Sequence, residues 1–345
     1  MRAAAALLLG GLGLLLAGAS APRGEPGPPR LLSQTGLYGK GALQVDPRHL
    51  AYSPQYPLWS DGAGKSRWIS LPPGGRIDAS NDDRWAFPVG TKLWKEFDFA
   101  GRKVETRMIW KASAKRWVFA TYLWNEAQTD AEVAPEAGVP GYVEIAPGKR
   151  HSIPGVSDCR NCHEDERTPV LGFNPLQLSP DRDPLAPHAE PLKPGMVTLR
   201  ELVGLGLLSP ARPEYVTSPP RIPSENPRAR ALLGYFTANC GSCHRADGTL
   251  GSLGLDFRHS AAARGEAEEP GFATTVGRTG KWALPGHLQG ESERIAPGSP
   301  SACVVLYRMK SRSPISQMPP LGTVLVDEEA VSLLERFVRE DLAER

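Results

Sequence analysis

Alternating apolar and polar positions predict a β-rich N-terminal part. Between residues 103 and 124, two apolar and aromatic runs flank the turn-like stretch KASAKR, a pattern typical of a β-hairpin. The preceding stretch KLWKEFDFAGRKVE repeats this arrangement across Ala100-Gly101, so we expect an antiparallel sheet or small sandwich. Because aromatic residues at strand spacing are usually core, we expect core positions rather than carbohydrate-stacking surfaces for seven of the eight tryptophans, Trp59, Trp68, Trp85, Trp94, Trp110, Trp117 and Trp124.

Helical periodicity dominates the end of the chain. The stretch ARALLGYFTAN predicts a helix that runs directly into Cys240, and DEEAVSLLERFVREDL predicts a C-terminal helix with acidic residues in its first turn. Its apolar stripe consists of Val331, Leu334, Phe337 and Val338. Before these helices, proline-rich connections surround one short helical piece, VTLRELVGLGLL. This middle segment as a whole has too few regular apolar periods to bury a core alone.

These patterns predict an α+β protein. We expect a β-rich, Trp-containing domain at residues 31–154, an irregular segment at 155–227, and an α-helical domain at 228–345. Proline (34) and glycine (36) are abundant, which agrees with long irregular connections.

The N-terminus has the layout of a secretory signal. One arginine, an apolar run from Ala3 to about Leu16 and then small residues predict a signal peptide at residues 1–19, followed by a flexible tether at 20–30. The apolar run is short for a membrane span and lacks a basic stop after it. We therefore expect a periplasmic protein with no membrane span after signal removal.

Composition excludes few partners. The 345 residues are 40% hydrophobic and 23% charged, as in an ordinary soluble globular protein. A formal charge of +2 without long runs of either sign gives no sign of a nucleic-acid stripe.

The most specific feature is a motif that occurs twice. Cys-x-x-Cys-His appears in SDCRNCHEDE and again in ANCGSCHRAD, and it uses four of the five cysteines. Covalent haem c requires every residue of it, because the thiols add to the porphyrin vinyl groups and the histidine gives the iron its proximal nitrogen. The sequence thus predicts two haem c groups, with thioether bonds at Cys159, Cys162, Cys240 and Cys243 and iron ligands at His163 and His244.

Three other chemistries explain the motif less well. A thioredoxin-like dithiol needs a βαβ pattern, which neither site follows. A zinc site built from both pairs, or a disulfide within each pair, leaves both adjacent histidines unexplained. The fifth cysteine, Cys303, lies in an apolar run and is most simply a buried thiol.

The sixth iron ligands are a separate question. For the second haem we expect Met318, because its thioether is a suitable ligand and two following prolines stiffen its loop, whereas Met309 is expected to pack in the core. For the first haem no such loop follows. We place His188 first because 25 residues of chain after His163 can reach around a haem at about 3.3 Å per residue. The alternatives are His151, Met196 and Met108.

Residues 228–345 resemble a class I cytochrome c domain, with an N-terminal helix into CGSCH, a late Met-Pro loop and a C-terminal helix. In that family the terminal helices cross through a small residue and an aromatic, which implies that Gly234, with Tyr235 or Phe236, meets Phe337. The whole mature chain also resembles bacterial dihaem c-type cytochromes, through YPLWSDGAGKSRWISLP, TYLWNEAQTDA and VLGFNPLQLSPDRDP. This resemblance implies a periplasmic electron carrier.

The sequence predicts an exported dihaem cytochrome that carries electrons between periplasmic redox proteins; it does not indicate the oligomeric state. It shows no Ser-His-Asp, paired-carboxylate or phosphate-cradling signature. The alternative is a dihaem oxidoreductase in which one five-coordinate haem reacts with peroxide or another small oxidant. The missing sixth ligand of the first haem motivates this alternative.

Overall fold

The computed structural model describes residues 27–39, 43–163 and 169–343. The predicted signal peptide and most of the predicted tether lie outside these residues. Within the described ranges, no helix is both long enough and apolar enough to cross a membrane.

The N-terminal part is built on a six-stranded antiparallel sheet with the order β1-β2-β4-β5-β6-β7. The β5/β6 pair is the predicted hairpin, and the predicted turn at Ala100-Gly101 joins β4 to β5. Both turn residues have positive φ, 52° and 77°, as a tight two-residue hairpin turn requires. The strands are β1 (Leu50–Ala51), β2 (Gly64–Ser70), β4 (Lys92–Phe99), β5 (Arg102–Lys111), β6 (Trp117–Trp124) and β7 (Ala131–Val133).

Two small pairs and a short helix complete this part. Strands β8 (Val139–Ala146) and β9 (Lys149–Ile153) form a hairpin, and β3 (Ile77–Asp78) pairs in parallel with β10 (Leu208–Ser209). The 3-10 helix η1 (Leu32–Gln34) packs beside the sheet.

The tryptophans are mainly core residues, as predicted. Trp85, Trp94 and Trp124 are buried, and the Trp94 indole N–H donates to Thr35 Oγ1 at 3.1 Å. The other four of the seven are half-buried, and Trp68, Trp110 and Trp117 pack against apolar clusters.

The middle segment shares its core with the sheet. Phe173, Leu199 and Leu202 are buried in one cluster with Ile69 and Leu93 of the sheet. This confirms that the segment does not bury a core alone. Its helices are α1 (Val156–His163), α2 (Leu199–Gly204) and α3 (Glu214–Thr217).

Helix α2 is shorter than the predicted stretch. Thr198 caps its start in a capping box with Glu201, and Gly206, at a φ of 64°, turns the chain away after Leu205.

The regular elements of the described C-terminal part are helices joined by long loops, and both predicted long helices are confirmed. Helix α4 (Pro227–Asn239) starts at Asn226, whose side chain accepts from the Arg228 and Ala229 amides. Helix α7 (Glu328–Arg336) continues into the π-helical turn η5 (Phe337–Asp341), and its four stripe residues are buried. The remaining helices are η2 (Gly251–Leu253), η3 (Glu266–Glu268), α5 (Pro270–Ala273), η4 (Pro300–Ala302) and α6 (Val304–Lys310).

One close contact between the two parts depends on a glycine. A Cβ on Gly234 of α4 would lie 2.1 Å from Cε1 of Tyr56, so only glycine admits this ring. The nearest neighbour of Gly234 is thus Tyr56 of the N-terminal part, whereas the resemblance to class I cytochromes implied Phe337. Helices α4 and α7 still share one apolar core, which contains Phe337. The Tyr56 hydroxyl donates to Asp183 at 3.0 Å.

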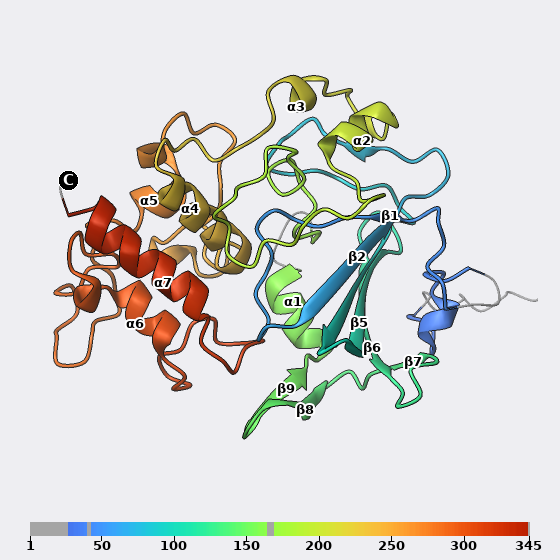
Figure 1. The fold of residues 1–345 in the computed structure, drawn as a ribbon, viewed down its shortest axis with the longest axis horizontal. Helices are drawn as coiled ribbons and strands as arrows, with labels where there is room; N and C mark the ends of the chain where they lie inside the picture. The colour runs from blue at the N-terminus through green and yellow to red at the C-terminus, as the bar shows by residue number, and fades with distance from the viewer. Residues whose placement is uncertain (1–26, 40–42, 164–168, 344–345) are drawn as a thin grey trace, which may run out of the picture.

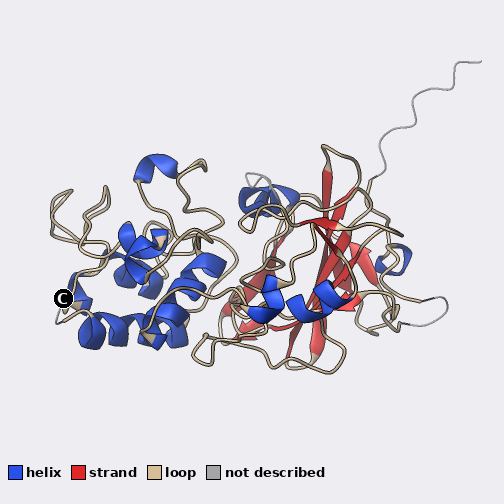
Figure 2. Ribbon diagram, turned by 90° about the horizontal axis from the view of Figure 1, so that it is seen from above, coloured by secondary structure: helices blue, strands red, loops and turns tan. Residues whose placement is uncertain are grey.

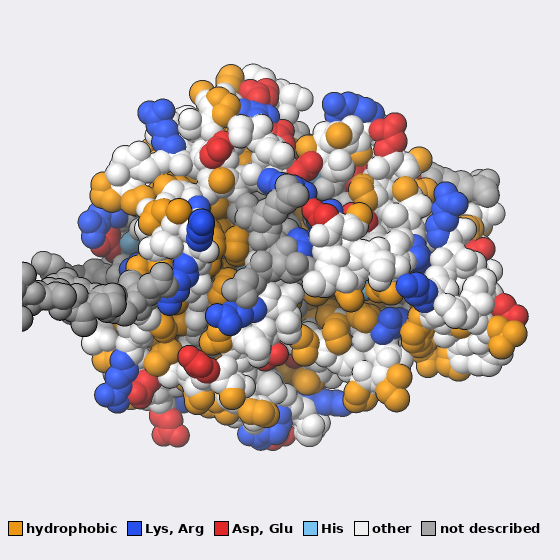
Figure 3. Space-filling view, turned by 180° about the vertical axis from the view of Figure 1, so that it is seen from behind, with side chains coloured by type: hydrophobic (Ala, Val, Ile, Leu, Met, Phe, Trp, Pro, Cys, Tyr) orange, Lys and Arg blue, Asp and Glu red, His pale blue; other side chains and the backbone are white. Residues whose placement is uncertain are grey.

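The sheet and the helical part lie at opposite ends of the long axis (Figure 2). Helix α1 lies beside the sheet on the side of the helical part, so the first motif is near the junction (Figure 1). Acidic and basic side chains are interspersed over the face in Figure 3, in agreement with the near-neutral charge. The structure confirms a mixed α+β protein.

Candidate functional site at the junction of the two motifs

The start of α1 is fixed by a tight packing contact. The Val156 amide donates to the carbonyl of Glu136 at 2.8 Å, and a Cβ on Gly155 would lie 2.8 Å from the same oxygen. Asp158 accepts from the Gly155 amide at 2.9 Å. This anchor sets the direction of α1, on which Cys159 and Cys162 lie three residues apart on one face.

His163 has the geometry of a metal-ligating imidazole. Its Nδ1 is 2.6 Å from the carbonyl oxygen of Pro169, which accepts the Nδ1 proton, and its ring centroid is 5.7 Å from that of Phe119. Burial, with smaller contributions from Lys95 and Arg107, outweighs the Pro169 hydrogen bond and lowers the pKa of His163 to about 4. The imidazole is therefore neutral, and the proton on Nδ1 leaves the Nε2 lone pair available to a metal.

The second motif continues from the end of α4 into the helical core. The Cys240 amide donates to Phe236 at 2.8 Å, and the His244 amide donates to Cys240 at 2.9 Å. The His244 ring packs edge-on against Phe257 at 5.8 Å. Burial lowers the pKa of His244, with smaller contributions from Arg308 and Arg294. Its buried Nδ1 has no hydrogen-bond partner among the described residues, so this site leaves an imidazole nitrogen unsatisfied.

The two motifs meet through one cysteine of each. The thiols of Cys162 and Cys243 are hydrogen-bonded to each other, and this contact, together with burial, raises the pKa of Cys162. Burial also raises the pKa of Cys159, and that of Cys240 to about 12. Because reactive dithiols need a lowered thiol pKa, these values argue against a thioredoxin-like pair. Among the described residues, no group of three or more His, Cys, Asp or Glu side chains is arranged as a metal site.

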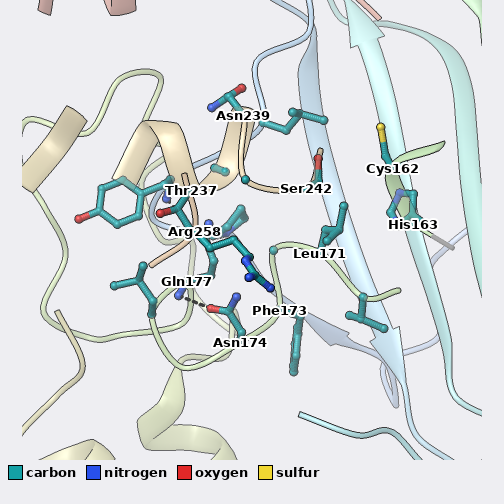
Figure 4. A pocket seen from close by; sticks show the side chains of 18 of the residues that line it. Cys162, His163, Leu171, Phe173, Asn174, Gln177, Thr237, Asn239, Ser242 and Arg258 are labelled. Atoms are coloured by element: carbon teal, nitrogen blue, oxygen red, sulfur yellow. Dashed lines mark hydrogen bonds between the residues drawn. The ribbon is translucent and has the colours of Figure 1, made fainter. Parts of the chain in front are cut away.

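The paired thiols face a large cavity. It has a volume of about 1300 Å³, more than the roughly 300–1,000 Å³ of ordinary small-molecule sites. Cys159, Cys162 and His163 line it from the first motif, and Cys243 lines it from the second. Figure 4 shows Cys162 and His163 on the side of the sheet, and Asn239 and Ser242 at the end of α4.

The sheet side of this cavity carries a buried ionic group. Glu105 is fully buried and pairs with Arg107 at 2.6 Å and with Nε2 of His151 at 3.0 Å. Burial alone would raise the pKa of Glu105, but Arg107 and the His151 hydrogen bond outweigh it and lower the pKa to about 2. Glu105 is therefore a carboxylate at neutral pH.

The predicted ligand Met318 lies next to the cavity but does not line it. Its neighbours Gln317 and Pro319 do line the cavity, and the Met318 amide donates to the carbonyl of Arg308 at 2.9 Å. Cys240 and His244 are also absent from the lining, so Cys243 is the residue of the haem motif through which the second site reaches the cavity. Met309 is buried in the helical core, as predicted.

His188 does not lie beside the first motif. Its Nε2 is 2.7 Å from Asp327 and its Nδ1 is 3.0 Å from Glu329, so both ring nitrogens face carboxylates at the start of α7. It does not line the shared cavity. Chain length set only how far His188 can reach, and the two acidic partners determine where it is held.

The alternatives to His188 divide in the same way. Met108 and His151 line the cavity, although His151 is hydrogen-bonded to Glu105. Met196 lies outside it and accepts from the Lys193 amide at 3.4 Å. Met108 itself is 1% exposed and packs in the apolar cluster with Trp94, and it alternates in β5 with the cavity-facing Arg107. Ligation by Met108 would therefore require its side chain to leave this cluster.

The sequence interpretation overlooked the basic residues of the cavity wall, Arg67, Lys95 and Arg107. The sequence did contain a signal for them, because each basic residue occupies a strand position with a buried residue two positions away on the same face.

Comparison with known proteins adds no identification. No family model, no curated protein and no solved structure matches this chain.

Proposed function

We propose that this chain is a periplasmic dihaem c-type cytochrome that carries electrons between redox proteins, with a C-terminal part of the class I cytochrome c kind. The observation that carries the proposal is the contact between Cys162 and Cys243 at the wall of one large cavity. Thioether attachment at these two sulfurs would bring two porphyrins to the same space. Haem supplies one-electron chemistry at iron when bound.

The described residues fit haem at both motifs to different extents. At the first, the Pro169 carbonyl orients His163 and fixes its tautomer. At the second, the Nδ1 of buried His244 has no hydrogen-bond partner among the described residues. Ligation of a metal, or a small rotation of the ring, would give this nitrogen a partner. These contacts support His163 and His244 as proximal ligands, and the proposal keeps Met318 as the expected sixth ligand of the second haem on the sequence pattern alone.

The role of the protein is then to position the two haems and to shield them from water. The anchored start of α1 holds Cys159 and Cys162 at a fixed distance from the sheet. The buried contact of Tyr56 with Gly234 holds the second motif against the same cavity. Fixed separation and exclusion of water both favour electron transfer without bond chemistry.

A dihaem oxidoreductase is the second candidate. It is favoured because two candidate ligands of the first haem are engaged by other residues: His188 by two carboxylates at the start of α7, and His151 by Glu105. If Met108 does not ligate, the first iron keeps an open position beside basic side chains.

Carbon monoxide separates the two functions. The chain is matured with covalent haem, reduced with dithionite, and its carbon monoxide difference spectrum is measured against total haem. The electron-carrier proposal expects no binding. Binding at half of the haem, retained in a Met108→Ala variant, identifies an open first site and favours the oxidoreductase. A matured chain with no covalent haem contradicts both.

A further inference from the structure

Three basic side chains lie in a row on the sheet face that forms one wall of the cavity. In the strand register, Arg67 of β2 is opposite Lys95 of β4, and Lys95 is opposite Arg107 of β5. All three line the cavity. Because like charges directly opposite each other destabilise a sheet, this row needs negative partners.

The two outer members of the row have such partners. Arg67 pairs with Glu190 at 2.7 Å, and Arg107 pairs with Glu105 at 2.6 Å. The central member has none. Among the described residues, Lys95 makes no ion pair or hydrogen bond, and its ammonium lies 4.8 Å from the ring centroid of Phe97. Both acidic groups are therefore already engaged by the arginines.

Basic side chains outnumber acidic ones around this wall of the cavity. Lys65 is next in the same strand face as Arg67, and its ammonium donates to the Ala63 carbonyl at 3.2 Å. Four basic side chains, Lys65, Arg67, Lys95 and Arg107, thus lie beside two acidic ones, Glu105 and Glu190, so that basic groups outnumber acidic groups by two. Burial lowers the pKa of Lys95 well below its ordinary value, with Arg67, Lys65 and Arg107 adding to the effect. A bound anion would reverse this penalty.

We propose that the row Arg67, Lys95 and Arg107 binds a carboxylate-type anion in the cavity, with Lys95 as its central contact. Carboxylate is the chemistry that a line of ammonium and guanidinium groups recognises. Two sources share it: the propionate groups of a haem attached at Cys159 and Cys162, and a free carboxylate. The first source rests on the proposed function, and the second does not.

The test uses matched substitutions at one position. Lys95→Met removes the charge at similar length, Lys95→Arg keeps it, and Lys115→Met removes one exposed charge from the β5/β6 turn as a control. Covalent haem is counted first in each matured protein. Redox titration then gives the two midpoint potentials. A titration with succinate, monitored by calorimetry and by haem absorbance, gives any affinity for a free carboxylate.

Propionates as the source predict that Lys95→Met lowers one midpoint potential, because loss of a cation favours the more positive, oxidised haem. Lys95→Arg and Lys115→Met keep the wild-type potentials, and succinate has no effect. A free carboxylate as the source predicts saturable succinate binding by the wild type, weakened about tenfold or more by Lys95→Met and kept by Lys95→Arg.

The proposal is overturned if Lys95→Met matches the wild type in both potentials and succinate has no effect on any variant. It is equally overturned if Lys95→Arg changes both readouts as much as Lys95→Met, because charge is then not what matters. Failure of the proposed function looks different: the wild type carries no covalent haem. In that case the succinate titration alone decides, and absence of binding contradicts the anion site.

Discussion

The two Cys-x-x-Cys-His motifs share a sequence pattern but have opposite surroundings. The first lies against a sheet face with buried charges, where Glu105, Arg107 and Glu190 are engaged in ion pairs. The second follows α4 into an apolar core that includes Phe236, Leu334 and Phe337. Under the proposed function, the motif would supply the same attachment chemistry at both sites, and the surrounding elements would make the two sites different. Charges that face the cavity would adjust the redox potential of a haem at the first site. Apolar packing would hold the iron ligands of a haem at the second site in place.

The largest expected effect comes from removing one motif at a time. Cys159→Ala with Cys162→Ala, and Cys240→Ala with Cys243→Ala, should each reduce covalent haem from two to one per chain, because each pair supplies its own thioether bonds. Intact-protein mass after maturation measures the count. A pair of substitutions that leaves the count unchanged would contradict the assignment of that motif.

Core truncation should affect the second region strongly. Phe337→Ala removes a ring that is 2% exposed and should lower the free energy of unfolding by about 3–5 kcal/mol, through lost burial and a cavity. Urea denaturation of the matured protein measures it. Leu288→Ala, at a side chain that is 72% exposed, is the control and should change the value by less than about 0.5 kcal/mol.

The first region should instead be sensitive to acid. The folded-state pKa of Glu105, about 2, lies below the ordinary value of 4.5, so its contribution to stability is complete above pH 4.5 and is lost as the pH falls toward 2. A shift of this size corresponds to about 3 kcal/mol. Urea denaturation at several pH values measures this effect: the denaturation midpoint of the wild type should decrease as the pH is lowered from 4.5 toward 2.

Glu105→Gln is the matched comparison, because it keeps the shape and removes the charge. Its stability should be lower at neutral pH and nearly flat between pH 4.5 and 2. An equally steep acid loss in Glu105→Gln would assign the effect to other carboxylates.

The smallest effect is expected at His188. Because its ring nitrogens face Asp327 and Glu329 and its side chain is 27% exposed, His188→Ala should cost about 1 kcal/mol or less. The absorbance spectra of both haems should be unchanged. A changed spectrum for the first haem would restore His188 as its ligand, and Met108→Ala is the companion variant.

Local patterns were enough to predict the two central hairpins and the two long helices. The hairpin of β5 and β6, the turn at Ala100-Gly101 and the buried stripe of α7 follow from alternation, turn chemistry and helical periodicity, which are all short-range. The sequence also predicted that the middle segment needs an external core, which the sheet provides.

Contacts between distant segments could not be predicted in this way. Nothing local indicates that Gly234 receives the ring of Tyr56, or that α7 supplies the carboxylates that hold His188. The row of Arg67, Lys95 and Arg107 appears only when the strand register is known, since the three residues lie far apart along the chain.

The central claim is that both motifs bring their haems to one cavity, and circular dichroism in the Soret region tests it most directly. The account predicts a two-signed band from interacting haems in the matured protein, which disappears in either cysteine-pair variant because one haem is lost. A wild-type spectrum equal to the sum of the two single-haem spectra would contradict a shared site.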